Sequence, residues 1–286
     1  MGAANSEIEE LKIIYSEIIQ GSSYLYSPNL YVKHFNEVDN IEVLKEKKRL
    51  LIKYKKDGIP SEEDKLKTAL EQGEWTKANE ENIDFLKLNI HDNEKMVMSI
   101  IPQQREGILK MIELRKQELI TEIIKRREIL GNTAEEFCNR DIINFITWKS
   151  LYKDSNCLIH AFNTQDEFEN LEDKELDNLI HEVDISASQF SDQNIKKISC
   201  MSFFLNPLSY VKDNWFNFFG ISICDLSNYQ YSLLAMGARN ISTLQNSEND
   251  PPLVLTSADI ENVVNFFDAQ YSILIGKRNT TTTKKR

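Results

Sequence analysis

The chain contains little of what usually interrupts regular secondary structure, since only 9 Gly and 6 Pro occur in 286 residues. Because glycine and proline break helices and strands most often, most of the chain is free to form regular elements. No alternation of apolar and polar residues extends beyond about five positions, which argues against a large sheet. Short strand candidates are confined to residues 157–161, 221–224 and 253–255. The sequence therefore predicts a mainly α, multi-helix protein.

Closely paired cysteines and long apolar runs are also missing. No window approaches the roughly eighteen apolar residues of a membrane-spanning helix. The polar start of the chain, with Glu7, Glu9 and Glu10, does not resemble a secretory signal. Scattered cysteines are typical of a reducing compartment. We therefore expect a cytoplasmic protein with no membrane contact and with free thiols at Cys138, Cys157, Cys200 and Cys224.

The common signatures of enzyme and metal sites are absent: a glycine-rich phosphate loop, His-Glu-x-x-His, Cys-x-x-Cys, an EF-hand loop and Gly-x-Ser-x-Gly. Cys157 and His160 have a spacing that could bind a metal, with His181 and Cys200 as the nearest further ligands. A structural zinc site normally takes two such tight pairs, so we expect no metal, no cofactor and no catalytic residue. The alternative is an enzyme whose site gathers Cys157, His160 and His181 from separate segments.

Basic residues are in deficit, because 34 Lys and Arg against 45 Asp and Glu give a formal net charge of −11. This balance argues against a general nucleic-acid binder. The one basic segment, residues 45–56, is interpreted as the solvated face of a helix. The alternative is a nucleic-acid or acidic-partner site centred on Lys48, Arg49 and Lys53. The acidic segment 165–184 is likewise expected to be a solvated helix face.

Helix starts are marked clearly along the chain. Ser61, Thr76, Thr133 and Thr164 are each followed by residues typical of a first helical turn, and they fit the N-cap position. Earlier in the chain, Ser6 is expected to cap a first helix that ends near Gly21. Residues 22–36 are expected to form a Tyr-rich loop, and a second helix is expected over about residues 40–56.

Residues 76–130 predict a long, charged, amphipathic helical region in which only Pro102 and Gly107 are expected breaks. The apolar face after Gly107 consists of Ile108, Leu109, Ile112, Leu119, Ile120, Ile123 and Leu130. Such a face needs a partner. We expect the core of the same chain to supply it, and a second subunit is the alternative.

The last third of the chain predicts three helices. The first covers residues 192–205 and ends before Pro207. The second is capped by Asp225 or Ser227 and runs to Met236, where Gly237 closes it. A last helix starts at Ser257, and the tail from Lys277 is expected to be disordered. The predicted regions are 1–56, 57–153, 154–276 and the tail 277–286.

An aromatic cluster stands out after residue 200, at Trp215, Phe216, Phe218 and Phe219. We expect it to pack in a core of this aromatic-rich helical region. The alternative is a hydrophobic anchor for another protein, because buried aromatic anchors dominate many interfaces. A surface that stacks nucleic-acid bases would need surrounding Lys and Arg, which are lacking here.

Two parts of the chain carry a family resemblance. One is Tyr54–Asp64, continuing through Gly73–Thr76 and the following helix to Thr133–Glu136. The other is Phe219–Gln230. Together they resemble tail-assembly chaperone and baseplate-hub-assembly proteins of large tailed bacteriophages, discontinuously over residues 54–240.

The resemblance implies a non-enzymatic assembly factor or structural subunit of a virion tail, made in the host cytoplasm and free of cofactors. Its partners would be other proteins, including phage tail or baseplate components, or further copies of the chain as a homo-oligomer. The expected partner-binding residues are Trp215, Phe216, Phe218, Phe219, Tyr229 and Gln230.

Overall fold

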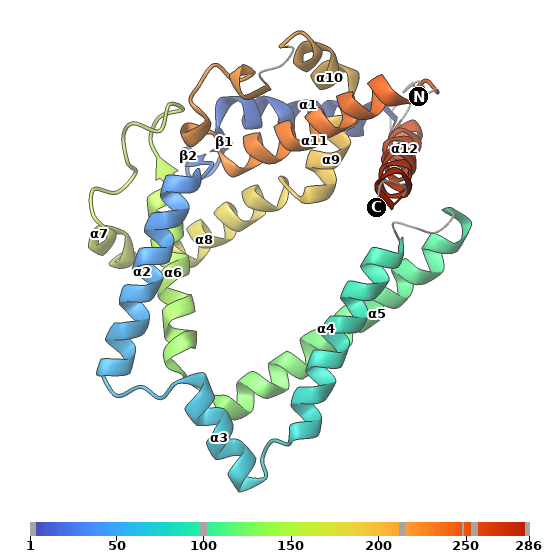
Figure 1. The fold of residues 1–286 in the computed structure, drawn as a ribbon. Coiled ribbons are helices and arrows are strands. Elements are labelled where there is room, and N and C mark those ends of the chain that lie inside the picture. The colour runs from blue at the N-terminus through green and yellow to red at the C-terminus, as the bar shows by residue number, and fades with distance from the viewer. Residues whose placement is uncertain (1–3, 98–101, 212–214, 248, 253–256, 284–286) are drawn as a thin grey trace. The chain divides into compact units, whose positions relative to one another are not determined.

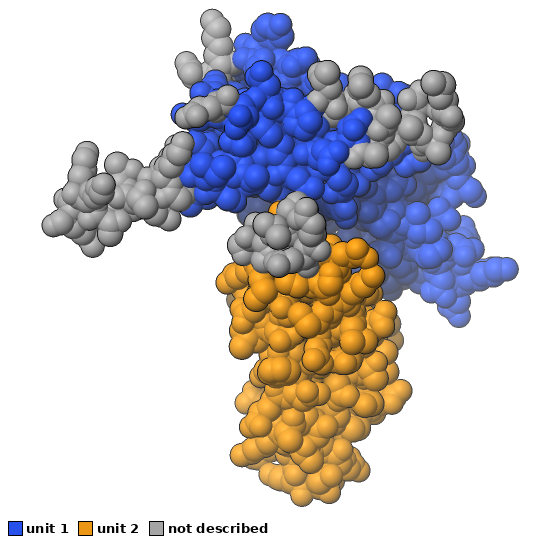
Figure 2. All heavy atoms as spheres, turned by 90° about the vertical axis from the view of Figure 1, so that its right-hand side faces the viewer, with its two compact units in different colours: residues 1–45, 143–286 blue, residues 46–142 orange. Residues whose placement is uncertain are grey.

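The computed structural model describes residues 4–97, 102–211, 215–247, 249–252 and 257–283. Figure 1 shows that helices make up most of this part, which confirms the mainly α prediction. The one sheet among the described residues is small, antiparallel and three-stranded, in the order β1-β2-β3. The chain divides into two compact units, coloured in Figure 2.

Unit 1 comprises residues 1–45 and 143–286, and unit 2 comprises residues 46–142. The unit boundaries fall inside two continuous helices, α2 and α6, whereas the regions expected from sequence were divided in the loops that follow them. The first part of unit 1 holds α1 (Ala4–Gln20), β1 (Ser22–Leu25), β2 (Leu30–Lys33) and the start of α2 (Glu37–Lys56). Its second part begins with the end of α6 (Ala134–Ser150), β3 (Leu151–Tyr152), α7 (Gln165–Glu169), α8 (Asp173–Ser188), α9 (Asp192–Cys200) and α10 (Ser202–Ser209). It ends with 3-10 turns at Trp215–Asn217 and Ile223–Asp225, followed by α11 (Asn228–Asn246) and α12 (Ser257–Thr283). Unit 2 holds the rest of α2 and α6, with α3 (Glu62–Gln72), α4 (Lys77–Val97) and α5 (Pro102–Leu130).

The main core of unit 1 forms where α1, α9, α11 and α12 pack together. Leu11, Ile198, Leu233, Ile260 and Phe267 are among its fully buried side chains. Each lies at helical spacing from other buried positions on its own helix, as the apolar periodicity predicts. The two terminal helices, α1 and α12, therefore each bury one apolar face in this core.

Two predicted helix ends in this core are wrong. Pro207 lies inside α10, two residues before the helix ends at Ser209, so its missing N–H removes only one hydrogen bond to the preceding turn. The actual break comes earlier, at Met201, which is extended between α9 and α10. Gly237 lies inside α11, which continues to Asn246. A Cβ at Gly237 would come within 2.5 Å of the Phe204 ring, so glycine here permits close helix packing instead of closing a helix.

The predicted loop at residues 22–36 is instead a β-hairpin, with Tyr24 paired to Tyr31 across β1 and β2. Asn29 takes a left-handed backbone (φ 66°) in the turn, a conformation that asparagine tolerates well. The strand alternation extends over only four residues on each side, too short to be detected from sequence. Leu25 and Val32 cover a second core around Phe168.

The other strand candidates and helix ends also differ from expectation. Residues 157–161 contribute a single bridge, from His160 to Tyr152, and residues 221–224 enter a 3-10 turn. Residues 253–255 lie outside the described residues. The first helix begins at Ala4, ahead of the predicted cap Ser6, and α12 continues to Thr283 through most of the predicted disordered tail. No proline follows residue 252, and one glycine costs a helix only about 1 kcal/mol.

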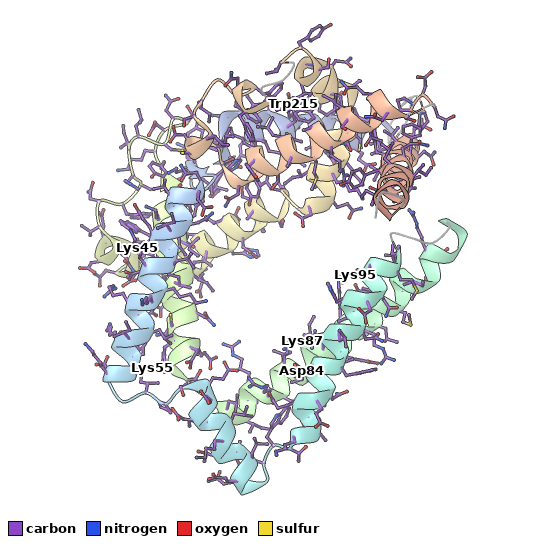
Figure 3. The ribbon with its side chains drawn as sticks, in the orientation of Figure 1. Lys45, Lys55, Asp84, Lys87, Lys95 and Trp215 are labelled. Carbon is purple, nitrogen blue, oxygen red and sulfur yellow. The ribbon has the colours of Figure 1, made fainter. Side chains whose placement is uncertain are left out.

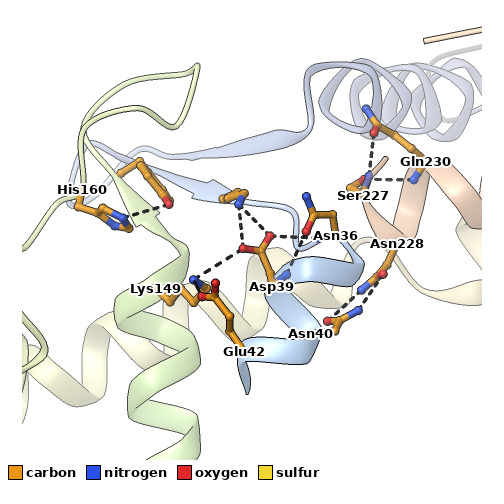
Figure 4. Close-up of polar contacts among 11 residues, drawn as sticks. Asn36, Asp39, Asn40, Glu42, Lys149, His160, Ser227, Asn228 and Gln230 are labelled. Atoms are coloured by element: carbon orange, nitrogen blue, oxygen red, sulfur yellow. Dashed lines mark hydrogen bonds and ion pairs between the residues drawn. The ribbon is translucent and has the colours of Figure 1, made fainter. Parts of the chain in front are cut away.

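Helix α2 begins at Glu37, earlier than predicted, because Asn36 caps it. The Asn36 side chain accepts a hydrogen bond from the Asp39 amide at 3.0 Å, and the Asp39 carboxylate accepts one from the Asn36 amide at 3.1 Å (Figure 4). This reciprocal pair has the geometry of a capping box. Lys33 and Lys149 hold the same Asp39 carboxylate from β2 and α6.

Unit 2 is organised by the caps that the sequence predicts. Ser61 forms a capping box with Asp64 at the start of α3, and Gly73 ends that helix with a left-handed backbone (φ 74°). Helices α4 and α5 then pack along one another as an antiparallel pair (Figure 1). Pro102 is the first residue of α5, as suits its missing N–H, whereas Gly107 does not interrupt the helix.

Candidate functional site

The α4–α5 pair buries only part of the apolar face predicted for α5. Ile112 and Leu130 are buried, and Ile108 and Leu119 are half-buried. The remaining predicted positions, Leu109, Ile120 and Ile123, are exposed. The expectation that the same chain covers this face therefore holds for one side of it only.

The exposed side carries four large apolar residues, which we call the α5 stripe: Leu109 near the start of the helix, and Ile120, Ile123 and Ile124 three turns further along. These residues are 44–56% exposed. At 100° per residue their positions fall within roughly 100° of the helix circumference, beside the buried seam. Monomeric proteins tolerate scattered exposed apolar residues, but a group such as Ile120, Ile123 and Ile124 on one face indicates a binding surface.

Charges of both signs border the α5 stripe. Lys116 pairs with Glu94 of α4 at 2.9 Å, and Arg127 pairs with Glu136. Elsewhere in unit 2, the Arg126 side chain bridges Glu62 and Glu80, joining the starts of α3 and α4 to the end of α5. These ion pairs satisfy the charges locally. An apolar surface with a paired, polar rim matches the usual anatomy of a protein interface.

The predicted basic face lies on α2 and is exposed, as expected for a solvated helix (Lys45 and Lys55 in Figure 3). Arg49 is held by Glu46 one turn earlier, and Lys55 contacts Glu135 at 3.4 Å. Lys53 lies 5.5 Å from the centre of the Tyr54 ring. Carboxylates within the basic segment weaken its field for phosphate, and nucleic-acid binding by Lys48, Arg49 and Lys53 stays a prediction.

The aromatic cluster packs largely against the core of unit 1. The Phe218 ring packs edge-on against Phe204, with 5.6 Å between the ring centres, and edge-on against Phe219, with 5.1 Å between the ring centres. Trp215 is also half-buried against this core, while Phe216 is 42% exposed. The expected core role therefore describes most of the cluster, and only Phe216 is largely available to a partner.

Tyr229 and Gln230 are not the exposed partner-binding residues that the sequence suggested. Gln230 is 3% exposed, completes the capping box of α11 with Ser227, and donates hydrogen bonds to the Ile18 and Ile19 carbonyls (Figure 4 shows the cap). The side chain thus makes three hydrogen bonds inside the fold and is not available to another protein. Tyr229 stacks on Phe190 at 4.6 Å. The capping pattern Ser227-x-x-Gln230 was the sequence signal for this role.

The dispersed Cys and His residues do not form a recognisable centre. His160 stacks on Tyr152, with 4.4 Å between the ring centres, and burial raises the pKa of the Cys157 thiol. A raised pKa disfavours the reactive thiolate. His181 is exposed on α8. Within the described ranges, no three or more His, Cys, Asp or Glu side chains are grouped so that they could hold a metal ion.

Comparison with known proteins supplies no family for this chain. No family model matches it, and neither any curated protein nor any solved structure is detectably similar to it. Across the described helices, none combines the length and apolar character needed to cross a membrane.

Proposed function

We propose that the protein is a non-enzymatic assembly factor or structural subunit that associates through the α5 stripe. The observation that carries this proposal is the exposure of Leu109, Ile120, Ile123 and Ile124 on one side of α5 beside the buried α4–α5 seam. Fully burying one such side chain contributes about 1.5–3 kcal/mol. Because about half of each is already covered, the stripe would contribute roughly 4 kcal/mol, about half of what a micromolar complex requires.

The first occupant we propose is a second copy of the chain. Acidic Glu113 and basic Lys116 and Arg127 lie on the same side of α5 as the stripe residues, so this surface has no single sign that would select an oppositely charged partner. A mixed rim suits self-pairing, in which each copy presents both signs to the other. The finer proposal is that such oligomers act in virion-tail assembly in a host cytoplasm. Its support is the resemblance of residues 54–240 to phage tail-assembly proteins.

Size-exclusion chromatography with multi-angle light scattering, at low and high salt, tests the proposal. We expect an oligomer that persists at high salt, because apolar contacts are not screened by ions. Replacing Ile120 and Ile123 together by Ser should return the protein to a monomer. The matched control replaces Phe85 and Leu88 of α4, which are equally exposed but lie off the stripe, and should leave the oligomer intact.

Two results would contradict this assignment. One is a monomer for the unaltered protein at every concentration and salt level. The other is an oligomer that responds equally to the α4 and α5 substitutions, since that would indicate unspecific hydrophobic association. Far-UV circular dichroism of each variant distinguishes loss of the oligomer from loss of the folded structure.

A further inference from the structure

Unit 1 contains a cavity of about 230 Å³ between the hairpin, α6, α8 and the start of α11. Its walls are mostly apolar, with Val32, Ile146, Val183, Phe190 and Tyr229 among them. For comparison, an apolar protein cavity of about 150 Å³ is enough to hold benzene. The cavity is therefore large enough for a substituted ring, and none of the roles argued above makes use of it.

Three rings gather at one wall of the cavity. His34 meets Phe190 edge-on at 4.5 Å and Tyr229 edge-on at 5.0 Å, while Phe190 and Tyr229 stack on each other. Aromatic walls of this kind provide both faces and edges for a further planar ring. Together the three rings make this wall suited to aromatic ligands more than to aliphatic ones.

His34 carries an unmet hydrogen-bonding group at this wall. The side chain is 5% exposed, and its Nε2 lies 2.7 Å from the Ser23 hydroxyl. Its Nδ1 is buried and has no partner. A buried polar atom without a partner costs about 1–3 kcal/mol, so a ligand that satisfied Nδ1 would recover part of that cost.

The Ser23–His34 hydrogen bond leaves Nδ1 unsatisfied in either tautomer of the ring. If the Ser23 hydroxyl accepts from Nε2–H, Nδ1 presents a lone pair; if the hydroxyl donates to Nε2, Nδ1 carries the proton. A ligand hydroxyl can both donate and accept, so it satisfies Nδ1 in both cases. Burial also lowers the pKa of His34 to about 4, so the ring is neutral near pH 7.

The mouth of the cavity has a second polar feature. Asn40 and Asn228 line it and hold each other through their side-chain amides, at 3.0 and 3.4 Å (Figure 4). Each amide retains one N–H and a carbonyl lone pair beyond this pair. Lys33 also lines the cavity, but its ammonium is paired with Asp39 at 2.8 Å, so the polar side of the lining offers no unpaired charge. This favours an uncharged ligand over an anion or a cation.

From this geometry we infer that the cavity is a binding site for a small, neutral aromatic molecule that carries one hydroxyl group. The ring would lie against Phe190 and Tyr229, and its hydroxyl would reach His34 Nδ1 after the imidazole tilts toward the cavity. Pockets for small ligands generally combine apolar walls with a few fixed polar groups in this way. The inference is independent of the α5 stripe, which belongs to the other unit.

Phenol and toluene are matched probes, because they share a ring and differ in one hydroxyl. Titration of the full-length protein, followed by calorimetry and by NMR shifts of the cavity methyl groups, should give saturable binding of both. Phenol should bind roughly three- to tenfold more tightly, as expected for one added hydrogen bond. In the variant His34→Leu, toluene binding should remain and the preference for phenol should disappear.

A second variant tests the cavity while leaving His34 unaltered, so its result does not depend on whether His34→Leu folds. Val183→Phe fills the cavity from α8 without touching the hydrogen bonds, and it should abolish binding of both probes while circular dichroism is unchanged. Failure of the unaltered protein to bind either probe would overturn the inference and mark the cavity as a water site. Equal affinities for phenol and toluene in the unaltered protein would overturn the role of His34.

Discussion

The close approach of α10 to α11 provides a sharp test of the fold. In Gly237→Ala, the new methyl group would lie 2.5 Å from the Phe204 ring and 2.6 Å from Leu208. Both neighbours are fully buried, so neither can move aside freely. Overpacking of this kind costs about 1–3 kcal/mol, while alanine gains about 1 kcal/mol of helix propensity. We therefore expect the free energy of unfolding to fall by roughly 0–2 kcal/mol.

Urea unfolding followed by far-UV circular dichroism measures this change. The matched control is Gly107→Ala, which makes the same substitution inside helix α5 where no atom lies within 4 Å of the new Cβ. With no clash to oppose propensity, the control should stabilise the protein by about 0.5–1 kcal/mol. A Gly237→Ala protein that is stabilised as much as the Gly107→Ala control would refute the close packing of these two helices. Loss of stability in both variants would refute the propensity argument.

Three further predictions concern caps, charge and the unit 2 core. Since the folded pKa of His34, about 4, lies below its ordinary value of 6.5, the unfolded chain is protonated first as pH falls. Stability should therefore drop by roughly 3 kcal/mol between pH 6.5 and 4, a loss absent from His34→Leu in parallel urea titrations. Ser227→Ala removes the N-cap of α11 and should lower the free energy of unfolding by about 1–2 kcal/mol. Ser227→Thr keeps a capping hydroxyl, so its melting temperature should stay near that of the parent protein. Trp75→Ala should lower the free energy of unfolding by about 3–5 kcal/mol, because Trp75 is buried and its indole N–H donates to Glu80 at 2.6 Å. The backbone amides of α3, α4 and α5 should then exchange with solvent faster, and unaltered protection of these amides would contradict the core assigned to unit 2.

The elements that the sequence predicted well depend on local rules. Ser61, Thr133 and Ser227 act as caps in the structure because capping involves only the next three residues of the chain. The buried faces of α1 and α12 followed from apolar spacing alone. In each case the interaction that decides the structure is contained within a few turns, so the sequence contains all of the relevant information.

The errors have a common physical origin in distant neighbours. Gly237 ends no helix because Phe204 and Leu208 require a residue without a side chain there. The hairpin at residues 22–36 is completed by β3, more than a hundred residues away in the chain, and by burial over Phe168. The early start of α2 is the exception, because Asn36-x-x-Asp39 is a capping pattern contained within four residues of the chain.

The sequence by itself determined the helical class, most helix starts and the apolar spacing of α5, because these depend on propensity, capping and periodicity within single segments. Only the tertiary structure decided which part of the α5 face stays exposed, because that depends on how much of it α4 covers. The same holds for His34. Its Ser23 partner lies eleven residues away, but the Phe190 and Tyr229 rings that enclose it come from α8–α11, and burial by such distant groups cannot be read from the local sequence.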